Sequence, residues 1–221
     1  MVDNYTLRAR ARAQLGHSIF KNSWFLVALA CIIPVLAETV LAGIPFIGTI
    51  ASIVVAGPLT YSLYSITTKV SRGESWELKL FLDGFKEGVG TSIFLYVLRA
   101  LFVALWSLLF IIPGIVKSYA YSMAFYIKQD DKDSNKEAKE YLDQSAKMMN
   151  GYKMKLFLLD LSFIGWYFLG ALCFGVGTLF VTPYHELARA NFYAELKMQK
   201  DMENAKSAAA YASSEEIFPE L

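Results

Sequence analysis

Two long stretches of this chain carry almost no charge, and they constrain the fold more than any other feature. Between residues 22 and 68 the only charged side chain is that of Glu38. Between residues 156 and 196 the charged side chains are those of Asp160, Glu186, Arg189 and Glu195. Apolar runs of about 18 residues or more are long enough to cross a bilayer as helices. This distribution predicts an all-α, polytopic transmembrane helical bundle.

Six apolar segments are candidates for membrane helices, and they pair through short Gly- or Pro-containing turns at 43–45, 113–114 and 173–177. We therefore expect about six helices in three hairpins. The fourth segment is the weakest, because thirteen helical residues rise only about 20 Å against a hydrocarbon core of about 30 Å. We therefore expect this segment either to extend as a helix into the next loop, to tilt, or to be re-entrant. The segments are 23–42, 46–67, 92–112, 115–127, 156–172 and 178–196.

Lysine and arginine are unevenly distributed between the connections. Segments 1–22, 69–91, 128–155 and 197–221 hold 18 of the 21 basic residues. Because basic loops stay on the cytoplasmic side, we expect a multipass plasma-membrane protein with both termini and both long loops (69–91 and 128–155) in the cytoplasm. The predicted organisation is an interfacial segment (1–22), a membrane domain (23–196) and a mobile cytoplasmic tail (197–221).

Two of the polar segments have the pattern of amphipathic helices. Segment 5–20 places Leu7, Ala11, Leu15 and Ile19 at four-residue spacing among arginines that suit anionic headgroups. Segment 134–149 opens with a capping box of Ser134 and Glu137, and Gly151 suits its end. Its apolar face comprises Ala138, Tyr141, Leu142, Ser145, Met148 and Met149. Such faces pack on the bilayer or the bundle, which we favour, or they dock a cytoplasmic protein partner.

Ionisable side chains at membrane depth are costly, so each one marks a candidate polar site. Arg99 and Asp160 lie at similar predicted depths and can pair if their helices touch. Glu186 and Arg189 lie three residues apart and can pair locally. These groups either fix helix packing as ion pairs, which we favour, or line a polar path for a solute. The candidates are Glu38, Arg99, Asp160, His185, Glu186 and Arg189.

Each predicted hairpin has a proline at or near the start of its returning helix: Pro58, Pro113, which Gly114 follows, and Pro183. Proline suits a first helical turn because the backbone N–H that it lacks has no intrahelical acceptor there. These positions are therefore predicted helix starts.

No catalytic, metal or cofactor site is predicted. His185 and Glu186 resemble the start of a zinc-protease helix, but the place of the second histidine is taken by Arg189, and the only other histidine is His17. Cys31 and Cys173 lie in apolar segments and predict neither a disulfide framework nor a metal site. A net charge of +1 gives no case for nucleic-acid binding.

Several strings, in order, resemble the bacterial integral membrane family catalogued as domain of unknown function 975. They are 13–15 (AQL), 56–59 (AGPL), 81–85 (FLDGF), 111–116 (IIPGIV), 119–124 (YAYSMA), 145–151 (SAKMMNG), 161–166 (LSFIGW), 183–184 (PY) and 192–193 (FY). The resemblance implies an uncharacterised multipass protein and brings no catalytic residues. More distantly, the proline-glycine hairpin followed by an amphipathic helix is similar to the membrane region attached to some glycerophosphodiester phosphodiesterases.

These observations favour a non-enzymatic protein that acts by binding a protein partner or lipid, as a scaffold, regulator or accessory. The alternative is a small-solute transporter or channel that uses the intramembrane charges, and either form can be a homo-oligomer. A third, less favoured hypothesis is an intramembrane lipid-handling enzyme that uses His185 and Glu186.

Overall fold

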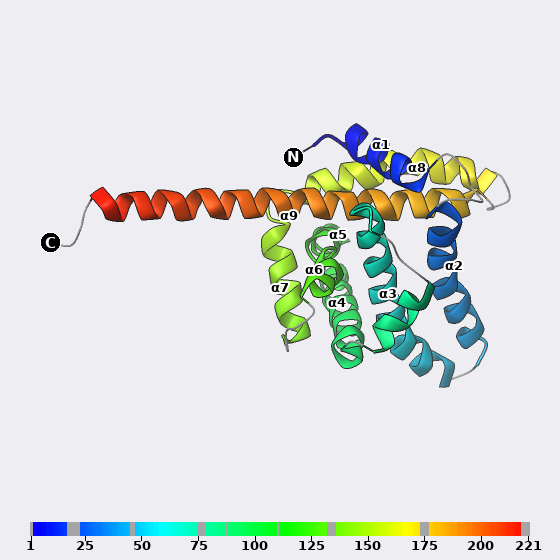
Figure 1. The fold of residues 1–221 in the computed structure, drawn as a ribbon. Helices are drawn as coiled ribbons and strands as arrows, with labels where there is room; N and C mark the ends of the chain where they lie inside the picture. The colour runs from blue at the N-terminus through cyan, green and yellow to red at the C-terminus, as the bar shows by residue number, and fades with distance from the viewer. Residues whose placement is uncertain are drawn as a thin grey trace.

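The computed structural model describes residues 2–16, 23–44, 47–74, 78–86, 88–109, 111–131, 136–172 and 177–217. Every regular element in these ranges is helical, which confirms the predicted all-α fold (Figure 1). The elements are α1 (Asn4–Leu15), α2 (Ser23–Ala42), α3 (Ile47–Ser71), the 3₁₀ helix η1 (Leu78–Phe85), α4 (Val89–Leu109), α5 (Ile111–Ala120), α6 (Ala124–Asp130), α7 (Ala138–Met148), α8 (Lys153–Leu172) and α9 (Thr178–Ile217).

Three helices of the described part are long and apolar enough to cross a membrane: α3, α4 and α8. Both α4 and α8 offer 20 such residues, which rise roughly 30 Å and match a typical hydrocarbon core. Helix α2 has the bounds of the first predicted span, although the apolar stretch described within it, Val27–Leu41, is shorter.

The helices that were predicted to pair do pack on each other: α2 on α3, α4 on α5, and α8 on α9. Figure 1 shows α2, α3 and α4 running roughly parallel, whereas α8 and α9 run across them. Helix α9 is the spine of the molecule, because it contacts α1, α2, α3, α7 and α8.

The predicted span 115–127 is not one helix, because a turn at residues 121–123 separates α5 from α6. The hydroxyl of Ser145 on α7 donates to the Ala120 carbonyl at 2.7 Å and accepts from the Met123 N–H at 3.1 Å. One buried side chain thus satisfies two backbone groups that the turn takes out of helical pairing. The polar partner comes from a helix remote in sequence, so the hydropathy of 115–127 alone does not predict the break.

The proline predictions have mixed outcomes. Pro113 lies in the first turn of α5, as predicted, but the predicted turn at 113–114 is wrong, because Pro113 and Gly114 are both helical and α5 begins at Ile111. A β-carbon at Gly114 would lie 2.7 Å from the Cα of Ser107, so this glycine permits the close packing of α5 on α4. Pro183 lies in the second turn of α9, near its start. The prediction for Pro58 is wrong, because α3 begins at Ile47 and Pro58 lies within it.

An aromatic cluster at the centre of the core joins α3, α6 and α9. The ring of Tyr126 lies 4.4 Å from that of Tyr64 and 5.0 Å from that of Tyr193, measured between centroids. Tyr64 also stacks on Phe125 at 5.6 Å. All four rings are buried, so this cluster fixes the middle of α9 against the helices that lie across it.

Both predicted amphipathic faces are buried against the protein. Leu7, Ala11 and Leu15 of α1 are fully buried, and α1 packs on α9. Helix α7 buries Ala138, Tyr141, Leu142 and Ser145, while Met149 just after it is also buried. Gly151 follows with a φ of 81°, in agreement with its predicted role at the helix end. Ile19 and Ser134 lie outside the described residues, as do His17 and Cys173.

Candidate functional site

One face of α9 carries polar side chains at four-residue intervals: His185, Arg189, Tyr193 and Lys197. Residues spaced by four lie one above another on a helix. Two carboxylates from other helices meet this stripe. Asp160 of α8 binds its first half, and Asp130 at the end of α6 binds its second half.

The first cluster forms around Asp160, inside one of the membrane-length helices. Its Oδ1 lies 2.8 Å from Nε2 of His185, and its Oδ2 accepts from Nη2 of Arg189 at 3.2 Å. The three side chains retain only 14–19% of their exposure. Two charged groups in an apolar helix pair thus compensate each other in place of water.

Hydrogen bonding orients the imidazole of His185 within this cluster. A carboxylate only accepts, so Nε2 of His185 donates to Asp160. The hydroxyl of Tyr167 on α8 lies 3.1 Å from the other ring nitrogen, Nδ1. A neutral imidazole with its proton on Nε2 therefore satisfies both contacts, with Tyr167 as donor. The ring of Phe163 packs on the imidazole at 4.6 Å between centroids.

Asp160, His185 and Arg189 are brought together as members of one site, but the two pairings considered from the sequence are not seen as ion pairs. Arg189 binds Asp160 rather than Glu186. Arg99 makes no ion pair with Asp160, whose ion-pair partners come from α9. Glu38 is exposed near the end of α2, in keeping with its predicted position. Glu186 and Arg189 still attract each other electrostatically, but the direct ion pair of the guanidinium is with the carboxylate on the neighbouring helix.

Two buried polar atoms beside this cluster have no hydrogen-bond partner among the described residues. They are Oε2 of Glu186 and Nε of Arg189. A buried polar atom without a partner costs about 1–3 kcal/mol, and a bound water, ion or ligand is the usual reason that such an atom is retained. The cluster therefore has hydrogen-bonding capacity beyond its own ion pairs.

The second cluster forms around Asp130, which was not among the predicted site residues. Its Oδ1 accepts from Nη2 of Arg72 at 2.6 Å, and its Oδ2 accepts from Lys197 at 2.5 Å and from the Tyr193 hydroxyl at 2.9 Å. Burial opposes the carboxylate charge, but the hydrogen bonds from Lys197, Arg72 and Tyr193 outweigh burial and lower the pKa of Asp130 below its usual 3.8.

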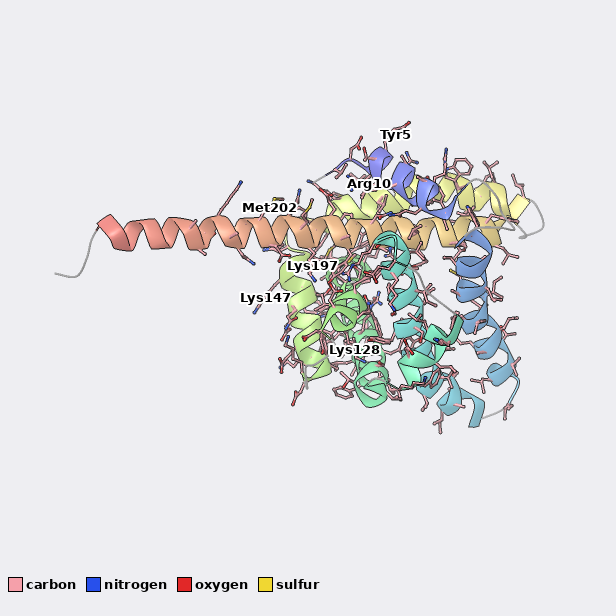
Figure 2. The ribbon with its side chains drawn as sticks, in the orientation of Figure 1. Tyr5, Arg10, Lys128, Lys147, Lys197 and Met202 are labelled. Carbon is pink, nitrogen blue, oxygen red and sulfur yellow. The ribbon has the colours of Figure 1, made fainter. Side chains whose placement is uncertain are left out.

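An open cavity of about 480 Å³ adjoins the Asp130 cluster where α6, α7 and α9 meet. Figure 2 shows Lys147 of α7 and Lys197 of α9 in this part of the molecule. The polar lining contains as many lysines as aspartates: Lys147, Lys197 and Lys200 against Asp130, Asp131 and Asp201. Because these charges balance, the cavity favours neither anions nor cations.

A third polar contact ties α1 to the other side of α9. The Gln14 side-chain oxygen accepts from Asn191 at 2.8 Å, and Arg10 lies 3.4 Å from the buried carboxylate of Glu195. Together the three contacts hold the middle of α9 from α1, α6 and α8. Within the described ranges no three His, Cys, Asp or Glu side chains gather closely enough to hold a metal ion.

The comparisons with known proteins find a family-level similarity for part of the chain. Residues 108–200 match the sequence model of the family described as "Protein of unknown function (DUF975)". No curated protein and no solved structure matches the chain. The similarity to the membrane region of glycerophosphodiester phosphodiesterases therefore stays a prediction. The matched region contains Asp130, Asp160 and the polar stripe of α9, so over residues 108–200 the chain is similar to the DUF975 family.

Proposed function

We propose that this chain is a non-enzymatic, multipass protein of the bacterial plasma membrane that binds a protein partner in the cytoplasm. Three helices of membrane length support an integral membrane location. The concentration of basic residues in the termini and the two long loops supports a cytoplasmic location for those segments. The observation that carries the proposal is the C-terminal part of α9, residues 198–217, which we call the arm.

The arm extends far beyond the helical body (Figure 1). Every side chain from 201 to 209 is exposed, although the helix continues to Ile217. The predicted division at residue 196 is thus not a helix end, because the chain contains neither glycine nor proline between Tyr184 and Ile217. Two apolar side chains on the arm, Met198 and Met202, retain 51% and 49% of their exposure.

A helix without tertiary contacts is marginal in water, because most helical stability comes from packing of an apolar face. Met198 and Met202 lie one turn apart, and Ala205 and Ala209 continue the same side of the helix. Methionine is common at adaptable protein-binding surfaces. These features favour a partner with an apolar groove that receives this side of the arm.

A photoreactive amino acid at position 202 tests the proposal in native membranes. We expect it to crosslink a distinct protein. For the double variant Met198→Gln/Met202→Gln the photoreactive group is moved to position 205, and we expect the crosslink to weaken at least about tenfold. The matched control is Met154→Gln, which changes a methionine at the start of α8 that is even more exposed (65%). It should leave the crosslink unchanged.

Two outcomes would remove the proposal. One is that position 202 crosslinks nothing, or only a second copy of the chain. The other is that Met154→Gln weakens the crosslink as much as the double variant, since the loss would then reflect a general effect on the membrane protein. A crosslinked homodimer would make self-association the role of the arm.

Transport of a small charged solute is the second candidate function. It is favoured by the unpartnered polar atoms of Glu186 and Arg189 next to Asp160. It is disfavoured by the mutual pairing of Asp160, His185 and Arg189, which leaves the carboxylate little capacity for a solute. Proteoliposomes that contain the chain and a pH-sensitive dye test the transport candidate, because proton-coupled flux of a solute changes the internal pH. A flux that Glu186→Gln abolishes while the fold is retained would favour transport, and no flux would count against it.

A further inference from the structure

We propose that a slot between α1, α2, α8 and α9 binds one anionic phospholipid of the bilayer, with its phosphate on Arg12 and an acyl chain along Trp24, Trp166 and Phe180. This site is separate from the arm and goes beyond the proposed function.

The slot is a partly enclosed space of about 330 Å³. That volume is at the lower end of the range of about 300–1,000 Å³ that is usual for small-molecule sites. Leu15, Trp24, Trp166, Phe180 and Val181 supply an apolar lining. The Trp24 and Phe180 rings lie 5.7 Å apart, so one wall of the slot is aromatic. Such a lining suits a hydrocarbon chain.

The polar end of the slot is formed by Arg12 in the last turn of α1. Its guanidinium carbon lies 5.7 Å from the centroid of the Tyr184 ring, which also lines the slot. Among the described residues no carboxylate forms an ion pair with Arg12, in contrast to Arg10, whose partner is Glu195. A planar guanidinium binds the oxygens of a phosphate in a bidentate manner, so the free charge is complementary to a phospholipid headgroup.

The apolar surface next to the slot indicates that the ligand comes from the bilayer. On α8, Leu169 lies about one turn after Trp166 on the same side of the helix and is 56% exposed. This is the exposed surface of a helix that is long and apolar enough to span a membrane. A lipid in the adjoining leaflet therefore reaches the slot without crossing water.

Native mass spectrometry of the full chain in detergent tests the site, with phosphatidylglycerol and phosphatidylcholine of identical acyl chains as probes. We expect tighter binding of phosphatidylglycerol. Arg12→Gln should weaken its binding about tenfold and weaken phosphatidylcholine binding by a smaller factor, because the choline cation offsets the phosphate charge. The matched control is Arg8→Gln, which removes the same charge one turn earlier on α1, outside the slot lining, and should change either affinity less than about twofold.

A second variant tests the apolar part of the site. Trp166→Gln replaces a side chain that is 45% exposed, so the fold should tolerate it, and it should weaken both lipids by a similar factor. Equal effects of Arg12→Gln and Arg8→Gln would overturn the proposal in favour of diffuse attraction. Equal affinities of the wild-type chain for both lipids would also overturn it. Displacement of phosphatidylglycerol by glycerol phosphate at similar concentrations would show that the slot does not hold a chain.

Discussion

The carboxylates of Asp160 and Asp130 attach the same helix to the body in two different environments. Asp160 belongs to a membrane-length helix and binds His185 and Arg189. Asp130 lies outside such helices and binds Arg72, Lys197 and Tyr193. In both clusters the acceptor is a carboxylate. The cations Arg72 and Lys197 around Asp130 are 35% and 41% exposed, whereas Arg189 at Asp160 is 19% exposed. The first cluster therefore depends on mutual pairing, and the second has water as an alternative partner.

This difference predicts how the two clusters respond to damage. Removal of one member of a poorly hydrated pair leaves an uncompensated charge, which is more costly than the pair is worth. Removal of one member of a hydrated pair lets water replace the lost partner. Substitutions at Asp160 should accordingly cost more than matched substitutions at Asp130.

The largest effect is expected for Asp160→Asn. It leaves the Arg189 charge without its carboxylate, and we expect a loss of about 2–3 kcal/mol in the free energy of unfolding, after a reduction for the partial exposure of the pair. Circular dichroism during unfolding in mixed micelles of sodium dodecyl sulfate measures it.

The double variant Asp160→Asn/Arg189→Gln supplies the control for that experiment. It removes both charges, so its loss should be smaller than the sum of the two single losses. If the loss of the double variant equalled the sum of the two single losses, Asp160 and Arg189 would not interact. The ion pair at the centre of the first cluster would then be contradicted.

A smaller, pH-dependent effect is expected for Asp130→Asn. The pKa of Asp130 is lower in the folded chain than its usual 3.8, so the folded state binds this proton less readily than the unfolded state does. The carboxylate therefore stabilises the fold above about pH 4, and this contribution is lost as the pH falls through the folded-state pKa. At pH 7 we expect Asp130→Asn to cost about 1–2 kcal/mol, reduced by the exposure of both cations.

Unfolding curves of the wild-type chain and Asp130→Asn at pH 7 and at pH 3 check the sign. The two free energies of unfolding should approach each other at the lower pH. A difference that stays constant between the two pH values would show that the carboxylate charge is not what stabilises this contact.

The two clusters also differ in how far they are predictable from sequence. Asp160, His185 and Arg189 are conspicuous because they interrupt apolar segments, so hydropathy identifies them. Asp130 stands beside Lys128 and Asp131 in a charged segment, where a carboxylate attracts no attention. A signal for Asp130 does exist on α9, in the four-residue spacing that continues from Arg189 to Tyr193 and Lys197. Because this spacing continues beyond the apolar run that ends at Leu196, it indicates a second acidic partner for α9.

The same contrast holds for the fold. The bounds of α2 and the positions of α3, α4 and α8 follow from local hydropathy, and they were predicted. The turn between α5 and α6 was not, because it depends on the hydroxyl of Ser145 on another helix. The continuation of α9 was missed because hydropathy falls after Leu196 while helix-forming residues continue. Hydropathy reports the solvent around a segment, whereas the end of a helix depends on backbone chemistry.

The smallest effects compare one tyrosine hydroxyl from each cluster. Tyr193→Phe removes a 2.9 Å hydrogen bond to the Asp130 carboxylate, and Tyr167→Phe removes a 3.1 Å contact with Nδ1 of His185. Phenylalanine preserves the packing of each ring, including the stacking of residue 193 on Tyr126. A hydrogen bond to a charged acceptor is worth more than one to a neutral acceptor, so we expect about 1.5 kcal/mol for Tyr193→Phe and about 0.5–1 kcal/mol for Tyr167→Phe.

This order is the reverse of that expected for the carboxylates, which is why the pair of variants is informative. Removal of a neutral donor leaves no unpaired charge behind. The loss in the free energy of unfolding then depends mainly on the strength of the lost hydrogen bond and little on how well water reaches the site. The same micelle unfolding measurement compares the two. If Tyr167→Phe lowered the free energy of unfolding more than Tyr193→Phe, the hydrogen bond between Tyr167 and Nδ1 of His185 would be as strong as one to a charged acceptor. The imidazole would then be positioned chiefly by Tyr167 rather than by Asp160.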